Sequence, residues 1–357
     1  MFYSLLLRDK GKPVERQGRK AIGPVRWQPA TERSFNMKKF MAVLILVVMV
    51  IPIFNGSVAE AANGFPKKGN ETEVANIIPM TGAWLGSWPT SDEKNIEHYN
   101  QLAKKPSNVI HTFINISQDT SWWKGSIDYV KSQGAMNLLT LEMKKSDGQD
   151  YSTVDINNGL LDAQFINLAK QLKSWQNGSE IWIRPLHEVN GNWYGWCIGD
   201  SQVNTNETYI AAFQRVVEIF RANEASNVKF VYNVNDQNVG KGSSYMEAYP
   251  GDDYVDYVSM DGYNWGTSRS GSTWQEFREI FDKPYNALVA GSERPVIIAE
   301  FASTEIGGSK PAWIIDMKNQ IRSGAYPKLI AAIWFNENKE TDWRIESTTS
   351  SLVAYKE

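Results

Sequence analysis

The sequence is poor in cysteine and histidine. Of its 357 residues, one is cysteine (Cys197) and three are histidine. A single cysteine cannot form a disulfide within the chain, so stability must come from a packed core. His98, His111 and His187 are far apart and form no HxxxH motif or Cys/His cluster. This spacing argues against a zinc or other transition-metal site, and we expect neither a metal nor a cofactor.

Long apolar runs are also lacking, except for one near the N-terminus. Residues 40–54 form an apolar run of 15 residues, preceded by Lys38 and Lys39 and followed by small residues around position 60. Fifteen residues fall short of the roughly 20 that cross a bilayer, although a membrane anchor is the alternative. The pattern predicts a secretory signal peptide at 37–61 and a secreted, extracellular protein. Residues 1–36 are then a doubtful upstream extension.

The remaining residues, 62–357, have few basic groups. They contain 27 Lys and Arg against 36 Asp and Glu, a formal charge of about −9. This acidic balance argues against nucleic acid as a partner, and we expect no membrane contact after signal cleavage. Their 296 residues suffice for one large core. We expect a single domain, and a monomer.

Tryptophan, by contrast, is abundant. The chain has 14 tryptophans, 13 of them after residue 61. Many must lie in the core. So many flat apolar faces with a polar edge also suit a cleft that stacks on sugar rings.

The order of apolar segments predicts the fold. Short β-rich runs alternate with helical-period stretches such as 160–176, 207–223 and 313–323, the pattern of a parallel sheet wrapped by helices. The alternative, a doubly wound open sheet, lacks a glycine-rich phosphate turn in this sequence. We therefore predict a single α/β domain, a (β/α)8 TIM barrel. Its eight strands are expected near residues 77–85, 109–115, 137–143, 180–188, 228–235, 254–263, 295–301 and 330–336.

Two of these strands end in a glutamate. The fourth ends in Trp-Ile-Arg-Pro-Leu-His-Glu, with Glu188 last, and the seventh ends in Val-Ile-Ile-Ala-Glu, with Glu300 last. In a barrel, polar residues at the C-terminal ends of strands point into the active site, and strands four and seven lie nearly opposite. Two facing carboxyl groups are what a retaining glycosidase needs, one as acid/base and one as nucleophile. Capping of loops is the alternative reading of each glutamate alone.

Five further residues are candidates for supporting the carboxylates or binding the substrate. Arg184 could keep the nucleophile anionic, and Tyr263, at the end of the sixth strand, could donate a hydrogen bond to it. His187 could line the site, and Trp193 follows Glu188 closely. Trp334, on the eighth strand, is predicted to be a stacking platform for the sugar, with a core position as the alternative.

These residues resemble glycoside hydrolase family 26, the β-mannanase-like family. The segment 184–194, RPLHEVNGNWY, is similar to the family's Arg-Pro-x-His-Glu-Met-Asn-Gly-x-Trp motif, and Ile-Ala-Glu-Phe at 298–301 is similar to its nucleophile strand. The resemblance covers roughly residues 77–340. It implies a retaining mechanism in a (β/α)8 barrel, with Glu188 as acid/base, Glu300 as nucleophile, Tyr263 as its hydrogen-bond donor and Trp334 as the platform.

The third and fifth strands depart from the family pattern. Many mannan-cleaving members have a histidine at the end of the third strand, where this chain has Glu142, either a loop charge or a hydroxyl-binding carboxylate. The fifth strand also lacks the usual Trp-Ser-Pro-Asn ending. The resemblance thus predicts an endo-β-1,4-mannanase, with a β-linked polysaccharide as its partner. A mixed-linkage β-1,3-1,4-glucanase and a non-catalytic carbohydrate-binding barrel stay open as alternatives.

Overall fold

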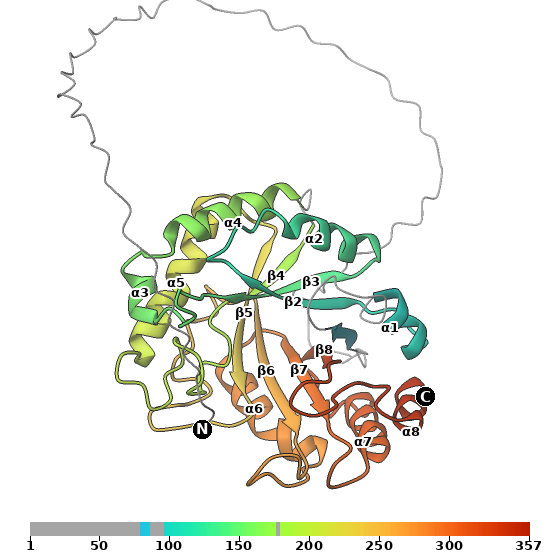
Figure 1. Ribbon diagram of the computed structural model, residues 1–357. Helices are drawn as coiled ribbons and strands as arrows, with labels where there is room; N and C mark the ends of the chain where they lie inside the picture. The colour runs from blue at the N-terminus through green and yellow to red at the C-terminus, as the bar shows by residue number, and fades with distance from the viewer. Residues whose placement is uncertain (1–78, 86–95, 176–178) are drawn as a thin grey trace, which may run out of the picture. The chain divides into compact units, whose positions relative to one another are not determined.

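A computed structural model describes residues 79–85, 96–175 and 179–357 of the chain (Figure 1). The predicted signal peptide at 37–61 and the doubtful extension at 1–36 lie outside the described residues. Secretion and the domain boundary at residue 62 therefore stay predictions. None of the helices in the described part is long and apolar enough to span a membrane.

The eight strands form a closed parallel barrel in sequence order, each hydrogen-bonded to the next and the last to the first. The predicted (β/α)8 fold is confirmed. The fourth strand is shorter than expected because Pro185 follows its last residue and supplies no N–H to the ladder. The strands are β1 Met80–Trp84, β2 Val109–Asn115, β3 Met136–Glu142, β4 Ile181–Arg184, β5 Val228–Asn235, β6 Tyr257–Asn264, β7 Val296–Ser303 and β8 Leu329–Phe335.

The helices follow the strands along the chain and bury their apolar stripes. The N-terminus of α5, for example, is fixed by Thr205, whose side chain accepts from the N–H of Thr208 while Thr208 caps in return. Figure 1 shows α7 and α8 beside β8, where the two helices contact each other. The helices are α1 Ile96–Ala103, α2 Trp123–Ser132, α3 Thr153–Asn157, α4 Asp162–Trp175, α5 Asn206–Ala222, α6 Phe277–Gly291, α7 Lys310–Arg322 and α8 Thr349–Lys356.

The inside of the barrel is layered, because alternate residues of each strand point inward. The lowest layer is an apolar cluster of nine buried residues. Above it, one strand period further on, polar side chains are buried: His111, Thr140, Arg184, Asn233 and Asp261. A separate, larger apolar cluster includes the buried faces of the helices. The polar layer therefore lies between the apolar cluster and the C-terminal end of the barrel.

Candidate active site

Arg184 lies at the centre of the polar layer. Its side chain is 0 % exposed. Its Nε donates to Thr140 Oγ1 (2.7 Å), and one Nη donates to Asp261 Oδ2 (2.6 Å). The other Nη bonds to Glu300 Oε1. The planar guanidinium thus bridges two carboxylates in fixed directions, which a lysine could not do. The two anions raise the pKa of Arg184 despite its burial, so the group stays cationic.

Glu300 turns inward because β7 is irregular at Ala299. The register passes from Met260–Ile298 to Asp261–Glu300, so Ala299 is an extra residue relative to β6. A bulge of this kind re-aims the next side chain, and here both Ala299 and Glu300 belong to the barrel interior. The second oxygen of Glu300 accepts a hydrogen bond from the hydroxyl of Tyr263 (2.6 Å). Glu300 therefore receives hydrogen bonds from both a cation and a phenol.

Glu188 stands on a strained loop after β4. Leu186 and Glu188 have φ of 52° and 53°, in the left-handed region, which costs about 1 kcal/mol or more for each such residue. Hydrogen bonds to the backbone hold this shape. Tyr209 donates to Leu186 O (2.8 Å), and the N–H of Glu188 donates to Asn233 Oδ1 (2.8 Å). The buried loop therefore has little freedom to move its carboxyl group.

Among the described residues, the carboxyl group of Glu188 has only neutral hydrogen-bond partners. Trp193 Nε1 donates to one oxygen (2.7 Å) and Asn235 Nδ2 to the other (2.9 Å). Burial, with the negative charge of Glu300 as a second cause, raises the pKa of Glu188 to about 7. The two donors lower the pKa, but by less. Glu188 can therefore hold a proton near neutral pH, whereas Glu300 lies beside the cation of Arg184.

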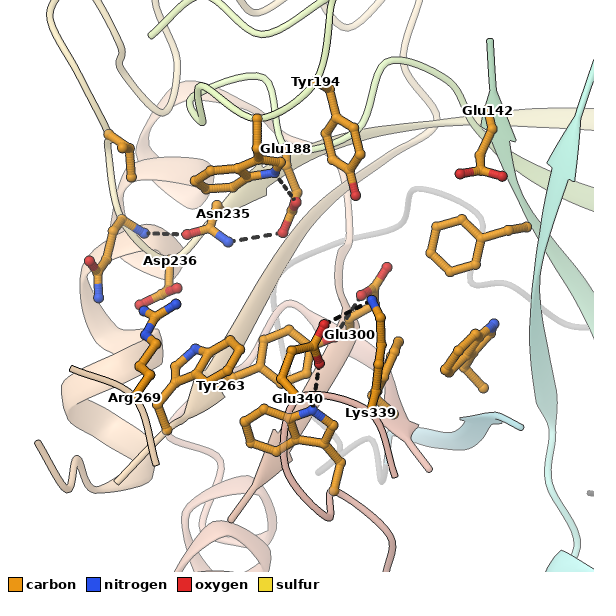
Figure 2. Close-up of a pocket in the computed structure, with 18 residues that line it drawn as sticks. Glu142, Glu188, Tyr194, Asn235, Asp236, Tyr263, Arg269, Glu300, Lys339 and Glu340 are labelled. Atoms are coloured by element: carbon orange, nitrogen blue, oxygen red, sulfur yellow. Dashed lines mark hydrogen bonds and ion pairs between the residues drawn. The ribbon is translucent and has the colours of Figure 1, made fainter. Parts of the chain in front are cut away.

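Glu188 and Glu300 both line one cavity of about 620 Å³ at the C-terminal mouth of the barrel (Figure 2). The two carboxyl groups face each other across it, with Glu142 toward one end and Asp236 and Arg269 toward the other. Aromatic rings make up much of the remaining wall, an arrangement that suits sugar rings. The aromatic lining residues are Trp84, Phe113, Trp193, Tyr194, Tyr263, Trp265, Phe335 and Trp343.

The other predicted binding residues fall into two groups. Trp193, 44 % exposed, and Tyr263 line the cavity as expected. Arg184 and His187 do not line it. Arg184 acts on Glu300 from below, and His187 is 1 % exposed and packed among Phe113, Tyr194 and Trp196. The prediction that Arg184 and His187 contact the substrate directly is therefore corrected. Both side chains lie behind the residues that line the cavity and support them.

The prediction that Trp334 is a stacking platform is wrong. Trp334 is 0 % exposed and packs against Trp313 of α7 and Tyr355 of α8. The reason is strand alternation. Ala331 and Ile333 point into the barrel, so Trp334 points outward and Phe335 points inward. The aromatic wall on this side comes instead from Phe335 and Trp343.

Several site residues were missed from the sequence. Asn235 on β5 bonds to Glu188, and Asp261 on β6 pairs with Arg184. Both lie near the C-terminal ends of strands and could have been found by the rule that located the glutamates. Trp343 lies in the β8–α8 loop (residues 336–348), where no sequence pattern distinguishes it from other tryptophans. Among the described residues, no group of three or more potential ligands could hold a metal.

Comparison with known proteins identifies the family. The profile of glycosyl hydrolase family 26 matches residues 115–320, more than half of the chain. Endoglucanase H of Acetivibrio thermocellus is 49% identical over 323 residues, covering 90% of this chain and 33% of that protein. Mannan endo-1,4-beta-mannosidase A and B of Caldalkalibacillus mannanilyticus is 29% identical, covering 58% of this chain and 41% of that protein. This chain thus spans less than half the length of either curated relative.

Among solved structures, a mannanase of Bacillus subtilis, BCman, superimposes with a TM-score of 0.59 at 17% identity, covering 79% of this chain and 86% of that chain. At this identity the likeness shows the fold alone. The family match rests on the sequence itself and includes Glu188, Tyr263 and Glu300. The chain belongs to glycosyl hydrolase family 26.

Proposed function

We propose that this protein is a retaining endo-β-glycanase in which Glu188 is the acid/base and Glu300 the nucleophile. One observation carries the proposal: Glu188 and Glu300 face the same cavity in opposite electrostatic surroundings. The pKa of Glu188 is raised to about 7, whereas Glu300 receives hydrogen bonds from Arg184 and Tyr263. Glycosidases need such a split, because one group must donate a proton while the other attacks.

The reaction has two steps. In the first, an oxygen of Glu300 bonds to the anomeric carbon while the glycosidic C–O bond breaks, and Glu188 gives its proton to the leaving oxygen. In the second, water attacks the same carbon and gives a proton to the Glu188 carboxylate, and the bond to Glu300 breaks. Two inversions restore the starting configuration. Arg184 and Tyr263 orient the Glu300 carboxylate before the first step and donate hydrogen bonds to both its oxygens again after the second.

The backbone of the substrate is a chain of β-linked hexoses, and two such substrates compete. Mannan is the substrate predicted from the sequence, and the names of the relatives that are about 29% identical support it. Mixed-linkage β-glucan has a separate argument. The relative named endoglucanase is 49% identical over 90% of this chain, and Glu142 takes the place of the strand-three histidine. We propose β-glucan as the substrate to test first, with mannan second.

The test compares polysaccharides side by side. Purified protein is incubated with barley β-glucan, galactomannan, glucomannan and β-1,3-xylan, and new reducing ends are counted. We expect release from barley β-glucan to exceed release from the other polymers at least tenfold, and the largest release from galactomannan would instead identify mannan as the substrate. Glu188→Ala and Glu300→Ala serve as blanks. Equal, background release by all three proteins on every polymer would favour a carbohydrate-binding barrel without catalysis. Proton NMR of the first product anomer distinguishes retention from inversion.

We also propose that the enzyme acts outside the cell, on the basis of the apolar run at 40–54 and the small residues after it. Expression of the full chain in a secreting bacterial host, followed by N-terminal sequencing of the protein in the medium, tests this. A mature end near Ala61 is expected. Protein that stays inside the cells with Met1 or Met37 at its end would contradict secretion.

A further inference from the structure

Lys310 is a buried cation to which the two-step reaction assigns no role. It is the first residue of α7, and its side chain is 0 % exposed. A helix N-terminus carries a partial positive charge, so the helix dipole disfavours a lysine there. Burial also disfavours the charge and lowers the pKa of Lys310 to about 8. A lysine in such a place needs strong hydrogen-bond partners.

Those partners lie in the β8–α8 loop. The ammonium of Lys310 donates to Asp342 O (3.2 Å), Arg344 O (2.7 Å) and Ser347 Oγ (2.9 Å). All three acceptors are neutral groups of this one loop. The three bonds from one buried side chain therefore fix the path of the loop. The two carbonyls belong to the residues immediately before and after Trp343 in the sequence.

Trp343 itself is held by a second donor. Its carbonyl accepts a hydrogen bond from Nε1 of Trp334 (2.9 Å), the buried tryptophan of β8. Three consecutive carbonyls, those of residues 342 to 344, are thus fixed by two side chains that do not line the cavity. The side chain of Trp343 does line the cavity and is 1 % exposed.

The ring of Trp343 packs against the residue that holds the nucleophile. Its centroid lies 5.1 Å from that of Tyr263, with an angle of 48° between the planes. Tyr263 in turn donates its hydroxyl to Glu300 Oε2. A continuous set of contacts therefore runs from Lys310 through the loop and Trp343 to the carboxylate of Glu300.

We propose that Lys310 and Trp334 are positioning residues: they fix Trp343 as a wall of the cavity and so keep the hydroxyl of Tyr263 on the nucleophile. This inference rests on the proposed function, because it assigns both residues to the nucleophile half of the reaction. Displacement of a catalytic group by about 1 Å can cost on the order of 100-fold in rate. Loosening of one loop can therefore reduce turnover while the fold persists.

The same helix supplies a matched control. Lys318 of α7 also donates to two backbone carbonyls, those of Ala354 (2.9 Å) and Tyr355 (3.2 Å). These carbonyls belong to the end of α8 and not to the loop that carries Trp343. Lys310→Met and Lys318→Met each remove one lysine–carbonyl anchor of α7, but only the first removes contacts beside the cavity.

The first measurement is independent of activity. Hydrogen–deuterium exchange, read by mass spectrometry on the full chain, follows the backbone amides of residues 337–348 and 349–356. In Lys310→Met we expect exchange in 337–348 to accelerate about tenfold or more, while 349–356 changes little. Lys318→Met should show the reverse. If residues 337–348 exchange in Lys310→Met at the same rate as in the wild-type protein, the proposal is overturned.

The second measurement separates positioning from general destabilisation. Lys310→Met should lose roughly 10- to 100-fold in kcat with a smaller change in KM, and Lys318→Met less than about threefold. With an aryl β-glycoside bearing a good leaving group, the acid is no longer needed, and the loss in Lys310→Met should persist because it concerns the nucleophile. A loss that disappears with this substrate, or equal losses in both lysine variants, would contradict the proposal.

Trp334→Phe provides a second variant in case Lys310→Met does not fold. It keeps a buried ring and removes the donor to Trp343 O, so the same changes in exchange and kcat are expected, smaller in size. Unchanged exchange in 337–348 together with unchanged kcat in Trp334→Phe would remove Trp334 from the proposal. Failure of the proposed function looks different, because wild type would then be inactive on every glycan while the exchange results stood.

Discussion

Glu188 and Glu300 share one cavity but are held there in different ways. Glu300 lies within a strand, turned inward by a bulge, and receives hydrogen bonds from a cation and a phenol. Glu188 lies outside its strand on a left-handed turn and receives hydrogen bonds from an indole and an amide. The difference separates the two carboxyl groups electrostatically, since a buried cation stabilises a carboxylate far more than neutral donors do.

Removal of the carboxyl groups themselves should have the largest effect. Glu300→Ala should reduce kcat on polysaccharide by on the order of 10⁴-fold or more, because no covalent intermediate can form. Glu188→Ala should cost roughly 10²- to 10⁴-fold, the usual contribution of a general acid. The rates come from reducing-end assays.

An activated aryl β-glycoside should separate the two variants. Its leaving group departs without a proton, so Glu188→Ala should form its glycosyl-enzyme nearly as fast as wild type, seen as a burst of released phenol. Glu300→Ala should show no burst. A burst in Glu300→Ala and none in Glu188→Ala would mean that Glu188 is the nucleophile and Glu300 the acid/base.

The cation beneath Glu300 should dominate stability. Arg184→Met leaves Asp261 and Glu300 in the barrel without their partner, and loss of one member of a buried ion pair costs about 3–5 kcal/mol. Urea unfolding at neutral pH measures the change. The control is Arg215→Met, which breaks the partly exposed pair with Asp162 and should cost less than about 1 kcal/mol. Equal losses in the two variants would mean that the barrel interior tolerates unpaired carboxylates.

The hydroxyl of Tyr263 should matter for rate more than for folding. Tyr263→Phe removes one donor from Glu300, and a hydrogen bond to a charged group is worth enough to reduce kcat about 10- to 100-fold. Tyr257→Phe is the matched control on the same strand. Its hydroxyl also donates to a carboxylate, Glu180 (3.1 Å), but Tyr257 begins β6 and lies away from the cavity. Similar kcat values for the two variants would argue against a role for Tyr263 in catalysis.

The sequence was sufficient for the fold and for the placement of Glu188 and Glu300 in one cavity, because both depend on strand periodicity and on strand ends. It was insufficient to explain which side of the sheet each strand-end residue faces. Trp334 was assigned to the cavity, although alternation along β8 directs it outward. Conversely, strict alternation would direct Glu300 outward, and only the bulge at Ala299 turns it in. The strand-end rule placed Glu300 on the cavity side correctly, although only the bulge explains that side, and it placed Trp334 on the wrong side.

Loops limited the prediction in a second way. Trp343 belongs to the loop after β8, and its place in the wall depends on donors from α7 and β8 that are distant in sequence. The positive φ of Glu188 likewise follows from contacts with β5 and the loop after β4, not from its own propensity. These features arise from tertiary contacts, so local patterns carry no signal for them.

The smallest expected effect concerns the proton of Glu188. Because its pKa is about 7 in the folded protein, kcat/KM should fall as pH rises through about 7, when the acid loses its proton. The donor Trp193 lowers this pKa, so Trp193→Phe should raise it and move the alkaline limb to higher pH, with kcat reduced less than about tenfold. Trp196→Phe, which removes a donor to His187 O in the same loop, should leave the limb in place. A limb that moves to lower pH in Trp193→Phe would contradict the assignment.

The same pKa has a consequence for stability. The folded protein binds a proton at Glu188 up to about pH 7, whereas the unfolded chain releases it near the ordinary value of 4.5. Between these values the folded state binds more protons, so this group makes the free energy of unfolding decrease as pH rises. Glu188→Gln should therefore make the slope of the free energy of unfolding against pH less negative between about pH 4.5 and 7. An unchanged slope would mean that Glu188 is already ionised in the cavity at neutral pH, and the contrast with Glu300 would then need another origin.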